Sequence, residues 1–399
     1  MEVILLFSSL FSVIVTSASI NSECILNVTN PDYERKLPLP LYNSSSNYEL
    51  ATPHQGLIRL QTGQNISFLC SGIRNYVRQT NANVSTVTCI GDDQVKLFRM
   101  VFHIAEISCK NSVRGNVRAT QEKCANNQGL VYQIGYQVTR TEWFTLITVC
   151  YIPSNGQTLY TRHILYGKEI KYRSKTKYRP DFSSSGQNDQ ITASLSYNQT
   201  FQKLVFNRIL KSSLLARKFI NDKSFLARGH LSPDADFLLA PTQFSTYFYI
   251  NTAPQWQRIN SANWKSVEIT TRDLAVHYGD LDIITGTHDI LTYLDQENNF
   301  QKIYLGKENV LPVPKYFWKI VFDPKSQKGI VFIILNDPYV ELPLEEPFCK
   351  DVCVEAGYTK KAWKNTDSGL VFCCDIINFR NIVKSSPNII STSLLTNPN

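Results

Sequence analysis

One stretch of this 399-residue chain collects residue types that can act on a phosphate ester. His230 follows Arg228 and Gly229 in the segment FLARGHLSPDADF. A neutral His can remove a proton from water near neutral pH. The planar guanidinium of Arg228 can bind a phosphate through two parallel hydrogen bonds. A single His is more often structural than catalytic, so the hypothesis of a site acting on phosphate esters depends on the residues that accompany His230.

Those partners recur at a regular spacing. Asn260, Trp264, Glu268 and Arg272 are each four residues apart, which on a helix places them along one slowly drifting stripe. The amide oxygen of Asn260 is a hard ligand suited to Mg²⁺, and Glu268 can hold a metal-bound water. Arg272 can neutralise charge on a pentavalent phosphate, and Asn251 can add a polar contact to nucleic acid. The alternative is an ordinary solvated helix face.

A basic segment precedes this stretch. Lys and Arg recur at every second residue of KEIKYRSKTKYRP, at Lys171, Arg173, Lys175, Lys177 and Arg179. We expect a strand with these five side chains on one face and Tyr172 and Tyr178 on the other. Such a cationic ribbon would attract phosphates. The alternative is an edge strand whose Lys residues prevent aggregation.

Together these residues resemble the DNA/RNA non-specific endonuclease family, the ββα-metal nucleases. The resemblance rests on Arg228-Gly229-His230, on Asn260 thirty residues after His230, and on the order Asn260, Trp264, Glu268. Asn251-Thr-Ala-Pro-Gln, Ile284-Thr285-Gly286 and a segment from Val313 to Lys319 resemble further family landmarks. The likeness covers residues 160 to 345. The cysteine-rich N-terminal part resembles the secreted arthropod gut and salivary branch, which includes tsetse-type salivary nucleic-acid-binding proteins.

The resemblance implies a role for each residue. His230 would be the general base, and Asn260 the only direct protein ligand of a Mg²⁺ or Mn²⁺ ion. Glu268 would order metal-bound water, and Arg272 would stabilise the leaving phosphate. DNA and RNA would both be substrates, without sequence preference. The family has an Asp where this chain has Ala227, and the loss of such a group typically costs about 10–100-fold in metal affinity or activity.

The elements that must position these residues indicate an α+β protein with an antiparallel sheet, and the resemblance implies a ββα-metal nuclease core. Hydrophobic residues make up 43% of the chain and charged residues 19%, which is a globular composition. LDIITGTHD, YFWKIVFDP and GIVFIIL are typical of buried strands. Residues 202–220 predict an amphipathic helix in which Leu204, Ile209, Leu214 and Phe219 form the apolar side.

The N-terminus and the cysteines indicate a secreted, extracellular glycoprotein. Residues 1–18 have the pattern of a signal peptide, and no later stretch is long and apolar enough to cross a bilayer. Ten Cys residues suit an oxidising compartment. Five N-glycosylation sequons start at Asn27, Asn43, Asn65, Asn83 and Asn198.

The cysteine positions divide the chain. We expect a disulfide-bonded β-rich domain over residues 19–150 with three bridges, and a nuclease domain over residues 151–375. The last four cysteines would form a clip at the end of the nuclease domain, in which Cys373 and Cys374 pair with Cys349 and Cys353 in one of two arrangements. Zinc binding by these four is the alternative. Residues 376–399 are expected to be a loosely ordered tail.

Three functions are compatible with a net charge of +8. The first is a secreted, metal-dependent endonuclease acting on DNA and RNA, with activity reduced by Ala227. The second is a nucleic-acid-binding protein with residual or no nuclease activity. The third is a secreted scaffold that binds acidic glycans, which leaves the spacing around His230 unexplained.

Overall fold

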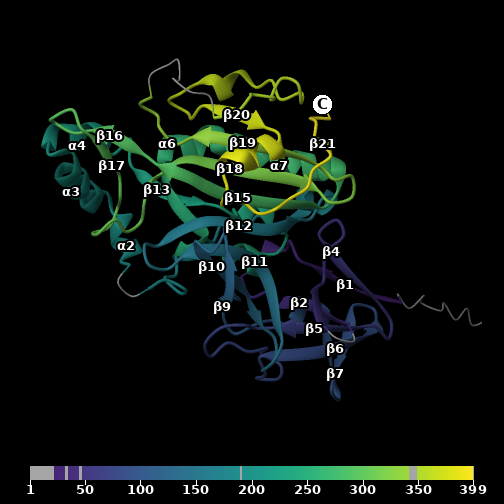
Figure 1. Cartoon of the computed structure of the whole chain (residues 1–399). Coiled ribbons are helices and arrows are strands. Elements are labelled where there is room, and N and C mark those ends of the chain that lie inside the picture. Colours follow the sequence, from purple (N-terminus) through teal and green to yellow (C-terminus); the bar gives the residue numbers. More distant parts are fainter. Residues whose placement is uncertain (1–21, 32–34, 45–46, 189–190, 341–347, 399) are drawn as a thin grey trace, which may run out of the picture.

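A computed structural model describes residues 22–31, 35–44, 47–188, 191–340 and 348–398 (Figure 1). The predicted signal peptide lies outside these residues. No helix in the described part is long and apolar enough to cross a membrane.

The first strands form a separate layer at one end of the molecule, which we call the N-terminal module (Figure 1). A six-stranded sheet has the order β3-β2-β5-β6-β7-β8, and a second sheet pairs β1 with β4. The bounds are β1 (Glu23–Asn27), β2 (Leu39–Ser44), β3 (Asn47–Leu50), β4 (Leu57–Gln61), β5 (Asn65–Leu69), β6 (Val84–Gly91), β7 (Gln94–Leu97) and β8 (Met100–His103), followed by the 3-10 helix η1 (Ile104–Glu106).

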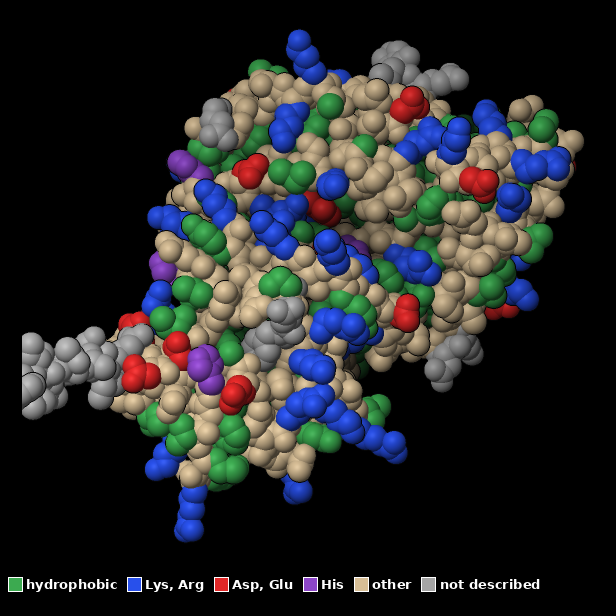
Figure 2. All heavy atoms as spheres, turned by 180° about the vertical axis from the view of Figure 1, so that it is seen from behind, with side chains coloured by type: hydrophobic (Ala, Val, Ile, Leu, Met, Phe, Trp, Pro, Cys, Tyr) green, Lys and Arg blue, Asp and Glu red, His purple; other side chains and the backbone are tan. Residues whose placement is uncertain are grey.

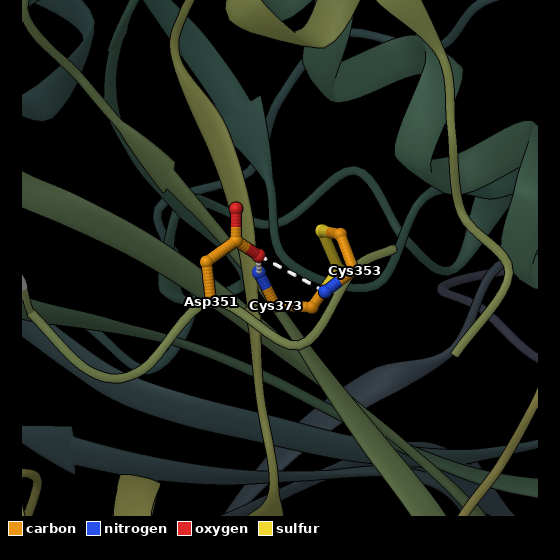
Figure 3. A group of neighbouring side chains, drawn as sticks. All are labelled: Asp351, Cys353 and Cys373. Atoms are coloured by element: carbon orange, nitrogen blue, oxygen red, sulfur yellow. Dashed lines mark hydrogen bonds between the residues drawn. A yellow bond between two sulfur atoms is a disulfide. The ribbon is translucent and has the colours of Figure 1, made fainter. Parts of the chain in front are cut away.

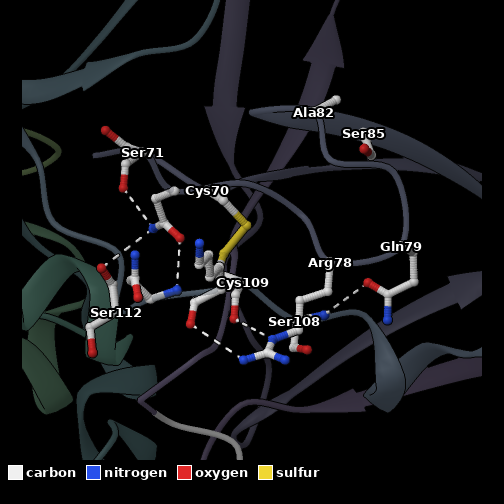
Figure 4. The surroundings of a disulfide bond; sticks show 12 residues. Cys70, Ser71, Arg78, Gln79, Ala82, Ser85, Ser108, Cys109 and Ser112 are labelled. Atoms are coloured by element: carbon white, nitrogen blue, oxygen red, sulfur yellow. Dashed lines mark hydrogen bonds between the residues drawn. A yellow bond between two sulfur atoms is a disulfide. The ribbon is translucent and has the colours of Figure 1, made fainter. Parts of the chain in front are cut away.

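Two disulfides stabilise this module, Cys24–Cys89 and Cys70–Cys109. Around the second, Arg78 donates from Nε to the carbonyl oxygen of Cys109 at 3.2 Å, and its backbone NH donates to Ser108 at 2.9 Å (Figure 4). Each bridge closes a loop and so limits the unfolded chain, typically by about 2–4 kcal/mol. The asparagines of all five sequons are exposed, as attached glycans would require.

The rest of the chain is built on a nine-stranded sheet with the order β20-β19-β18-β15-β12-β11-β10-β9, to which β21 adds beside β19. Every pairing is antiparallel except that of β21. The bounds are β9 (Asn116–Cys124), β10 (Gly129–Gln137), β11 (Trp143–Ile152), β12 (Gln157–Leu165), β15 (Leu281–Ile290), β18 (Pro314–Asp323), β19 (Lys328–Leu335), β20 (Val371–Cys374) and β21 (Ser393–Leu394). The expected boundary at residue 150 falls inside β11, within this sheet, and a two-domain division stays a prediction.

The central strands carry mostly apolar side chains on both sides because helices cover both faces. On β18, Phe317 and Val321 belong to the same core as Val267 of the helix α7 (Lys265–Tyr278) and Trp264, which directly precedes that helix. Trp318 and Ile320 face the other way and pack with Phe379 of α8 (Ile376–Ile382). The three predicted strands β15, β18 and β19 are thus confirmed as buried sheet.

A β-β-α unit lies beside this sheet. The strands β13 (Leu226–His230) and β14 (Thr252–Trp256) pair antiparallel, and a continuous helical segment follows. That segment comprises α6 (Gln257–Ile259), one π-helical turn, η5 (Asn260–Trp264), and α7. The α+β class and the nuclease-type core expected from the sequence are therefore present.

Shorter elements connect these parts. They are η2 (Lys168–Tyr172), α2 (Ala193–Ser196), α3 (Gln199–Leu210), α4 (Ser213–Phe219), η3 (Asp234–Asp236), α5 (Ala240–Phe244), η4 (Tyr249–Asn251), β16 (Thr292–Leu294), β17 (Phe300–Lys302) and η6 (Lys361–Lys364).

The predicted helix over residues 202–220 is wrong as a single element. Lys211 has a left-handed backbone (φ 53°), which ends α3 before α4 begins. Leu204 and Leu214 are 63% and 73% exposed, whereas Phe206 and Leu210 are buried. The break rotates the second helix, so one apolar stripe cannot continue across it.

The loosely ordered tail is also wrong. α8 packs on the sheet through Ile376 and Phe379, and β21 pairs parallel with β19. Leu395 is fully buried. The apolar residues of this segment are too irregularly spaced to show a helical or strand period, yet each fills a site on the existing core.

The disulfide predictions are confirmed. Cys124–Cys150 is the third bridge of the first half, and Cys349–Cys374 and Cys353–Cys373 form the C-terminal clip. Asp351 lies beside the clip and accepts hydrogen bonds from the backbone NH of Cys353 at 3.0 Å and of Cys373 at 3.1 Å (Figure 3). Within the described residues this is the one cluster of His, Cys, Asp or Glu with metal-binding proximity. Its two sulfurs are bonded to each other and its carboxylate is used, so the zinc alternative fails.

Candidate active site

His230 is the last residue of β13, and its ring makes no hydrogen bond to the described residues. It packs between Phe182 and Tyr247, whose ring centroids each lie 5.1 Å away. Its Nε2 atom is buried without a partner. Burial lowers the pKa of His230 to about 4. The imidazole is therefore neutral at physiological pH, which is the protonation state a general base requires.

Asp234 links His230 to the basic segment. Its carboxylate accepts a hydrogen bond from the hydroxyl of Tyr247 at 2.8 Å and pairs with Arg179 at 2.9 Å. The negative charge of Asp234 partly opposes the effect of burial on the pKa of His230, and Arg179 acts in the other direction. Asp234 and its partner Arg179 are therefore both near enough to His230 to influence the pKa of its ring.

Arg272 is fixed by a buried chain of hydrogen bonds. Its Nη1 donates to Asp236 at 2.7 Å, and the other oxygen of Asp236 lies 3.2 Å from Nε2 of His163. Nδ1 of His163 lies 2.9 Å from the hydroxyl of Ser232. Burial raises the pKa of Asp236, but the hydrogen bond from His163 and the charge of Arg272 outweigh it and hold that pKa well below its usual range. Asp236 is therefore a permanent anion that orients the guanidinium of Arg272.

The floor of the site is a row of polar residues on three neighbouring strands. Thr161 lies opposite Thr285, and Thr285 lies opposite Lys319, so all three share one face of the sheet. The ammonium of Lys319 is fully buried, donates to Thr285 at 2.5 Å and lies 5.5 Å from the ring of Trp264. Burial lowers the pKa of Lys319, and the charges of Asp236 and Glu268 oppose this effect.

Glu268 lies on the face of α7 that covers this row. It is partly exposed and makes no hydrogen bond to the described residues. Burial raises the pKa of Glu268 to about 7, although Lys319 and Arg272 both act to lower it. A carboxylate that is poorly solvated and has no hydrogen-bond partner favours a nearby cation or its water shell.

Asn260 lies eight residues before Glu268, at the first residue of the π-helical turn. Its side chain is partly exposed, and among the described residues no hydrogen bond engages its amide. π-helical turns frequently occur at functional sites. The uncommitted amide oxygen of Asn260 and the unpaired carboxylate of Glu268 fit a Mg²⁺ ion that takes few protein ligands and keeps several waters. Asn260 would hold such an ion directly, and Glu268 would hold its water.

Arg228 and Asn251 have different surroundings. The guanidinium of Arg228 lies 5.2–5.7 Å from the rings of Phe182, Tyr197 and Tyr249. Its Nε is buried without a partner. The rings hold the cation beside His230 without neutralising it, so Arg228 remains available for a phosphate.

Asn251 is fully buried instead. Its amide nitrogen donates to the carbonyls of Ser232 at 2.8 Å and Thr246 at 2.9 Å, and its oxygen accepts from the backbone NH of Ser232 at 3.0 Å. A side chain with every group used inside the core cannot reach a phosphate in this conformation. The structure corrects the expected nucleic-acid contact of Asn251: the residue shapes the turn after His230.

The basic segment is extended but is not a strand. Lys171 and Tyr172 belong to η2, and residues 173–179 pair with no neighbouring strand. Lys175, Lys177 and Arg179 are exposed, whereas Ser174 and Thr176 between them are buried. The backbone NH of Ser174 donates to Leu238 at 2.8 Å, and Gln243 donates to the carbonyl of Ser174 at 2.8 Å. Alternating exposure was expected, but the predicted strand is wrong because the segment is held by loops and side chains.

Figure 2 shows one face of the molecule, on which Lys and Arg side chains gather around a hollow. This distribution suits a polyanionic ligand.

Comparison with known proteins now decides the family. The model of the DNA/RNA non-specific endonuclease family matches residues 127–378. The chain belongs to this family. It is 33% identical over 371 residues to a salivary endonuclease of Lutzomyia longipalpis, covering 90% of this chain and 84% of the relative. It is 26% identical to the salivary protein Tsal2A of Glossina morsitans morsitans, covering 96% of this chain and 97% of that protein. Among solved structures, a complex of EndoG with EndoGI gives a TM-score of 0.38 at 15% identity, over 64% of this chain and 89% of that chain.

Ala227, where the family motif has Asp, lies directly opposite Gln255 on the paired strand. Gln255 is fully buried, and both its amide nitrogen and its amide oxygen lack hydrogen-bond partners among the described residues. Side chains directly opposite each other in such a pair lie on the same face, with Cβ atoms about 5 Å apart. The amide of Gln255 is therefore left unsatisfied next to the position where a carboxylate is missing.

Sequence reasoning missed several residues of this endonuclease site. Asp234 and Asp236 follow His230 closely in the sequence, and their acidic type next to a catalytic His was an available signal. Lys319 ends a recognised landmark. His163 gave no signal, because only the register of β12 brings it beside Asp236.

Proposed function

We propose that the protein is a secreted, divalent-metal-dependent endonuclease that hydrolyses the phosphodiester bonds of DNA and RNA without sequence preference. The observation that carries the proposal is the free imidazole of His230, whose pKa is lowered to about 4, next to a cluster with a fixed Arg272 and an uncommitted Asn260 and Glu268. Family membership and the salivary relatives support the same conclusion.

The chain's own residues would divide the work as follows. His230 takes a proton from the attacking water, because its ring is neutral and free of other hydrogen bonds. Arg272, oriented by Asp236, offers its remaining NH groups to the charged phosphate oxygens. Arg228 binds a neighbouring phosphate oxygen from its aromatic surroundings. A bound Mg²⁺ or Mn²⁺ at Asn260 would stabilise charge on the scissile phosphate and the departing oxygen.

Sequence-independent cleavage is consistent with the kinds of groups present. Arg and Lys side chains contact phosphates, which carry no sequence information directly. The exposed Lys175 and Lys177 add to this set. DNA and RNA share the phosphate, so a site built on phosphate contacts serves both.

The test is digestion of plasmid DNA and double-stranded RNA with and without a chelator. Wild-type protein should cleave both, and the chelator should stop it. His230→Ala should lose cleavage and keep binding. Equal cleavage by wild type and His230→Ala would refute the proposal.

The second candidate is a nucleic-acid-binding protein with residual activity, favoured by Ala227 and the unsatisfied Gln255. It predicts tight, salt-sensitive binding with little turnover. The same digestion separates the two candidates, because the wild-type chain would then bind both substrates and leave them intact.

A further inference from the structure

A cleft of about 730 Å³ lies between the N-terminal module and the basic segment. One wall includes Arg35, Gln55 and Gly56 of the N-terminal module, and the other consists of residues 171–173 and 175–178. The family match starts at residue 127, so one wall of this cleft lies outside the part of the chain that defines the family.

Specific contacts fix the two walls relative to each other. Glu169 of η2 accepts a hydrogen bond from the backbone NH of Gln55 at 2.6 Å, and its other oxygen lies 2.8 Å from Nδ1 of His54. The guanidinium of Arg35 lies 4.3 Å from the ring centroid of Tyr178. His54 of the N-terminal module thus has its partner, Glu169, on the opposite wall.

The described lining of the cleft is cationic. Five of its described lining residues are Lys or Arg and none is acidic: Arg35, Lys171, Arg173, Lys175 and Lys177. Cationic grooves of this kind follow the phosphates of a nucleic-acid backbone.

The cleft also leads to the site around His230. Burial lowers the pKa of Arg173, and the positive charge of Arg272 lowers it further. Arg173 therefore lies near Arg272. At the other end of the basic segment, Arg179 pairs with Asp234 beside His230. A strand lying along the basic segment would therefore pass both Arg272 and His230.

Aromatic side chains distinguish a single strand from a duplex. Tyr172 lines the cleft and is 44% exposed, a large value for an aromatic ring with no partner ring among those described. Tyr178 lines the cleft as well. Unpaired bases stack on such rings, whereas the bases of a duplex already stack on each other.

We propose that this cleft is an entry groove for a single strand of nucleic acid, and that the N-terminal module supplies one of its walls. The phosphates lie against the Lys and Arg side chains, and bases stack on Tyr172. This inference rests on the proposed nuclease function for the direction of the strand, but the binding itself can be measured without cleavage.

The experiment is fluorescence anisotropy with a labelled oligothymidylate and a labelled duplex, in a chelator that prevents cleavage. Arg35→Glu is compared with Arg99→Glu, an exposed Arg of the same module beyond β7 and away from the cleft. Tyr172→Ala is compared with Tyr172→Phe, which keeps the ring and loses only the hydroxyl. Thermal unfolding verifies that each variant is folded.

Arg35→Glu should weaken binding of the single strand and reduce the salt slope by about 0.7 for the lost phosphate contact, whereas Arg99→Glu should change neither. Tyr172→Ala should weaken strand binding about tenfold and duplex binding much less, and Tyr172→Phe should bind like wild type.

Equal effects of Arg35→Glu and Arg99→Glu on binding of the single strand would overturn the groove. An equal loss of strand and duplex in Tyr172→Ala would overturn the single-strand assignment. If wild type binds in this pattern but never cleaves, the groove stands and the proposed nuclease function fails. If wild type cleaves both substrates while these variants bind the single strand normally, the proposed nuclease function stands and the groove fails.

Discussion

Replacing Asp236 by Asn tests whether the buried chain behind Arg272 matters for catalysis. Asp236 is 1% exposed and accepts from Arg272 at 2.7 Å, with His163 on its other oxygen at 3.2 Å. Asn has nearly the same volume but no charge. The single oxygen of the Asn side chain can accept a hydrogen bond from Arg272 or from His163, but not from both. Its NH₂ group would then lie against the remaining donor.

The expected magnitude follows from burial. Removing one partner of a buried ion pair typically costs about 3–5 kcal/mol. Because Asn keeps the volume and one acceptor, we expect the lower end, about 3 kcal/mol of unfolding free energy. A guanidinium displaced by about 1 Å from the phosphate should lower kcat about 100-fold. KM should change little, because Arg228 and the basic segment remain.

The assay is steady-state cleavage of a fluorogenic oligonucleotide, combined with thermal unfolding. Asp273→Asn is the matched control, because Asp273 directly follows Arg272 on α7 but is exposed to solvent. That control should stay within about twofold of wild type, since exposed charges contribute little. If Asp236→Asn folds and keeps the wild-type kcat, then Asp236 does not position Arg272, or Arg272 does not act in the transition state.

Three further outcomes follow from the site. His230→Ala should lower kcat by about 10²–10⁴ while anisotropy in a chelator shows unchanged binding, and a loss of binding instead would indicate a structural role. At low Mg²⁺ concentration, cleavage should fall as pH drops through the pKa of Glu268 at about 7, because the protonated acid cannot accept from metal-bound water. Higher Mg²⁺ concentrations should move this acidic limb of the pH–activity profile toward lower pH, down to a limit near 4 set by the pKa of His230. An acidic limb that does not depend on Mg²⁺ would contradict the role of Glu268. Ala227→Asp should strengthen Mg²⁺ dependence and raise cleavage by about 10–100-fold, whereas unchanged activity would mean that the missing carboxylate is not limiting.

The helical part of the site could be predicted because its spacing is local. Asn260, Glu268 and Arg272 lie on one continuous helical segment, as their four-residue spacing indicated. The π-helical turn at Asn260 was not predictable, since the inserted residue leaves the pattern of residue types unchanged. The antiparallel sheet and the disulfide clip also follow from local signals, namely apolar runs and neighbouring cysteines.

The basic segment shows why a correct pattern can give a wrong element. Lys175, Lys177 and Arg179 do alternate with buried Ser174 and Thr176. Alternation reports an extended backbone, in which successive side chains point to opposite sides. It does not report a neighbouring strand. Here the backbone bonds instead to the loop at Leu238 and to the amide of Gln243.

The buried polar chain could not be predicted from spacing at all. His163 and Asp236 are 73 residues apart, and Lys319 is a further 83 residues along. They meet because β12, β15 and β18 place Thr161, Thr285 and Lys319 in one row. A shift of one residue in either pairing would turn these side chains to the other face. The position of His163 on β12 therefore contributes, through Asp236, to the orientation of Arg272.

We expect the alanine at position 227 to change how the proposed metal site depends on pH. With Asp at that position, two carboxylates would share the work of holding metal-bound water. With Ala227, the uncommitted carboxylate among the described residues around Asn260 is Glu268, since Asp234 and Asp236 are paired with Arg179 and Arg272. Burial raises the pKa of Glu268 to about 7, so near neutral pH a large fraction of the protein has no free carboxylate there. If Glu268 holds metal-bound water as proposed, Mg²⁺ binding must first displace a proton, and we expect Mg²⁺ affinity in this chain to be more pH-sensitive than in Ala227→Asp.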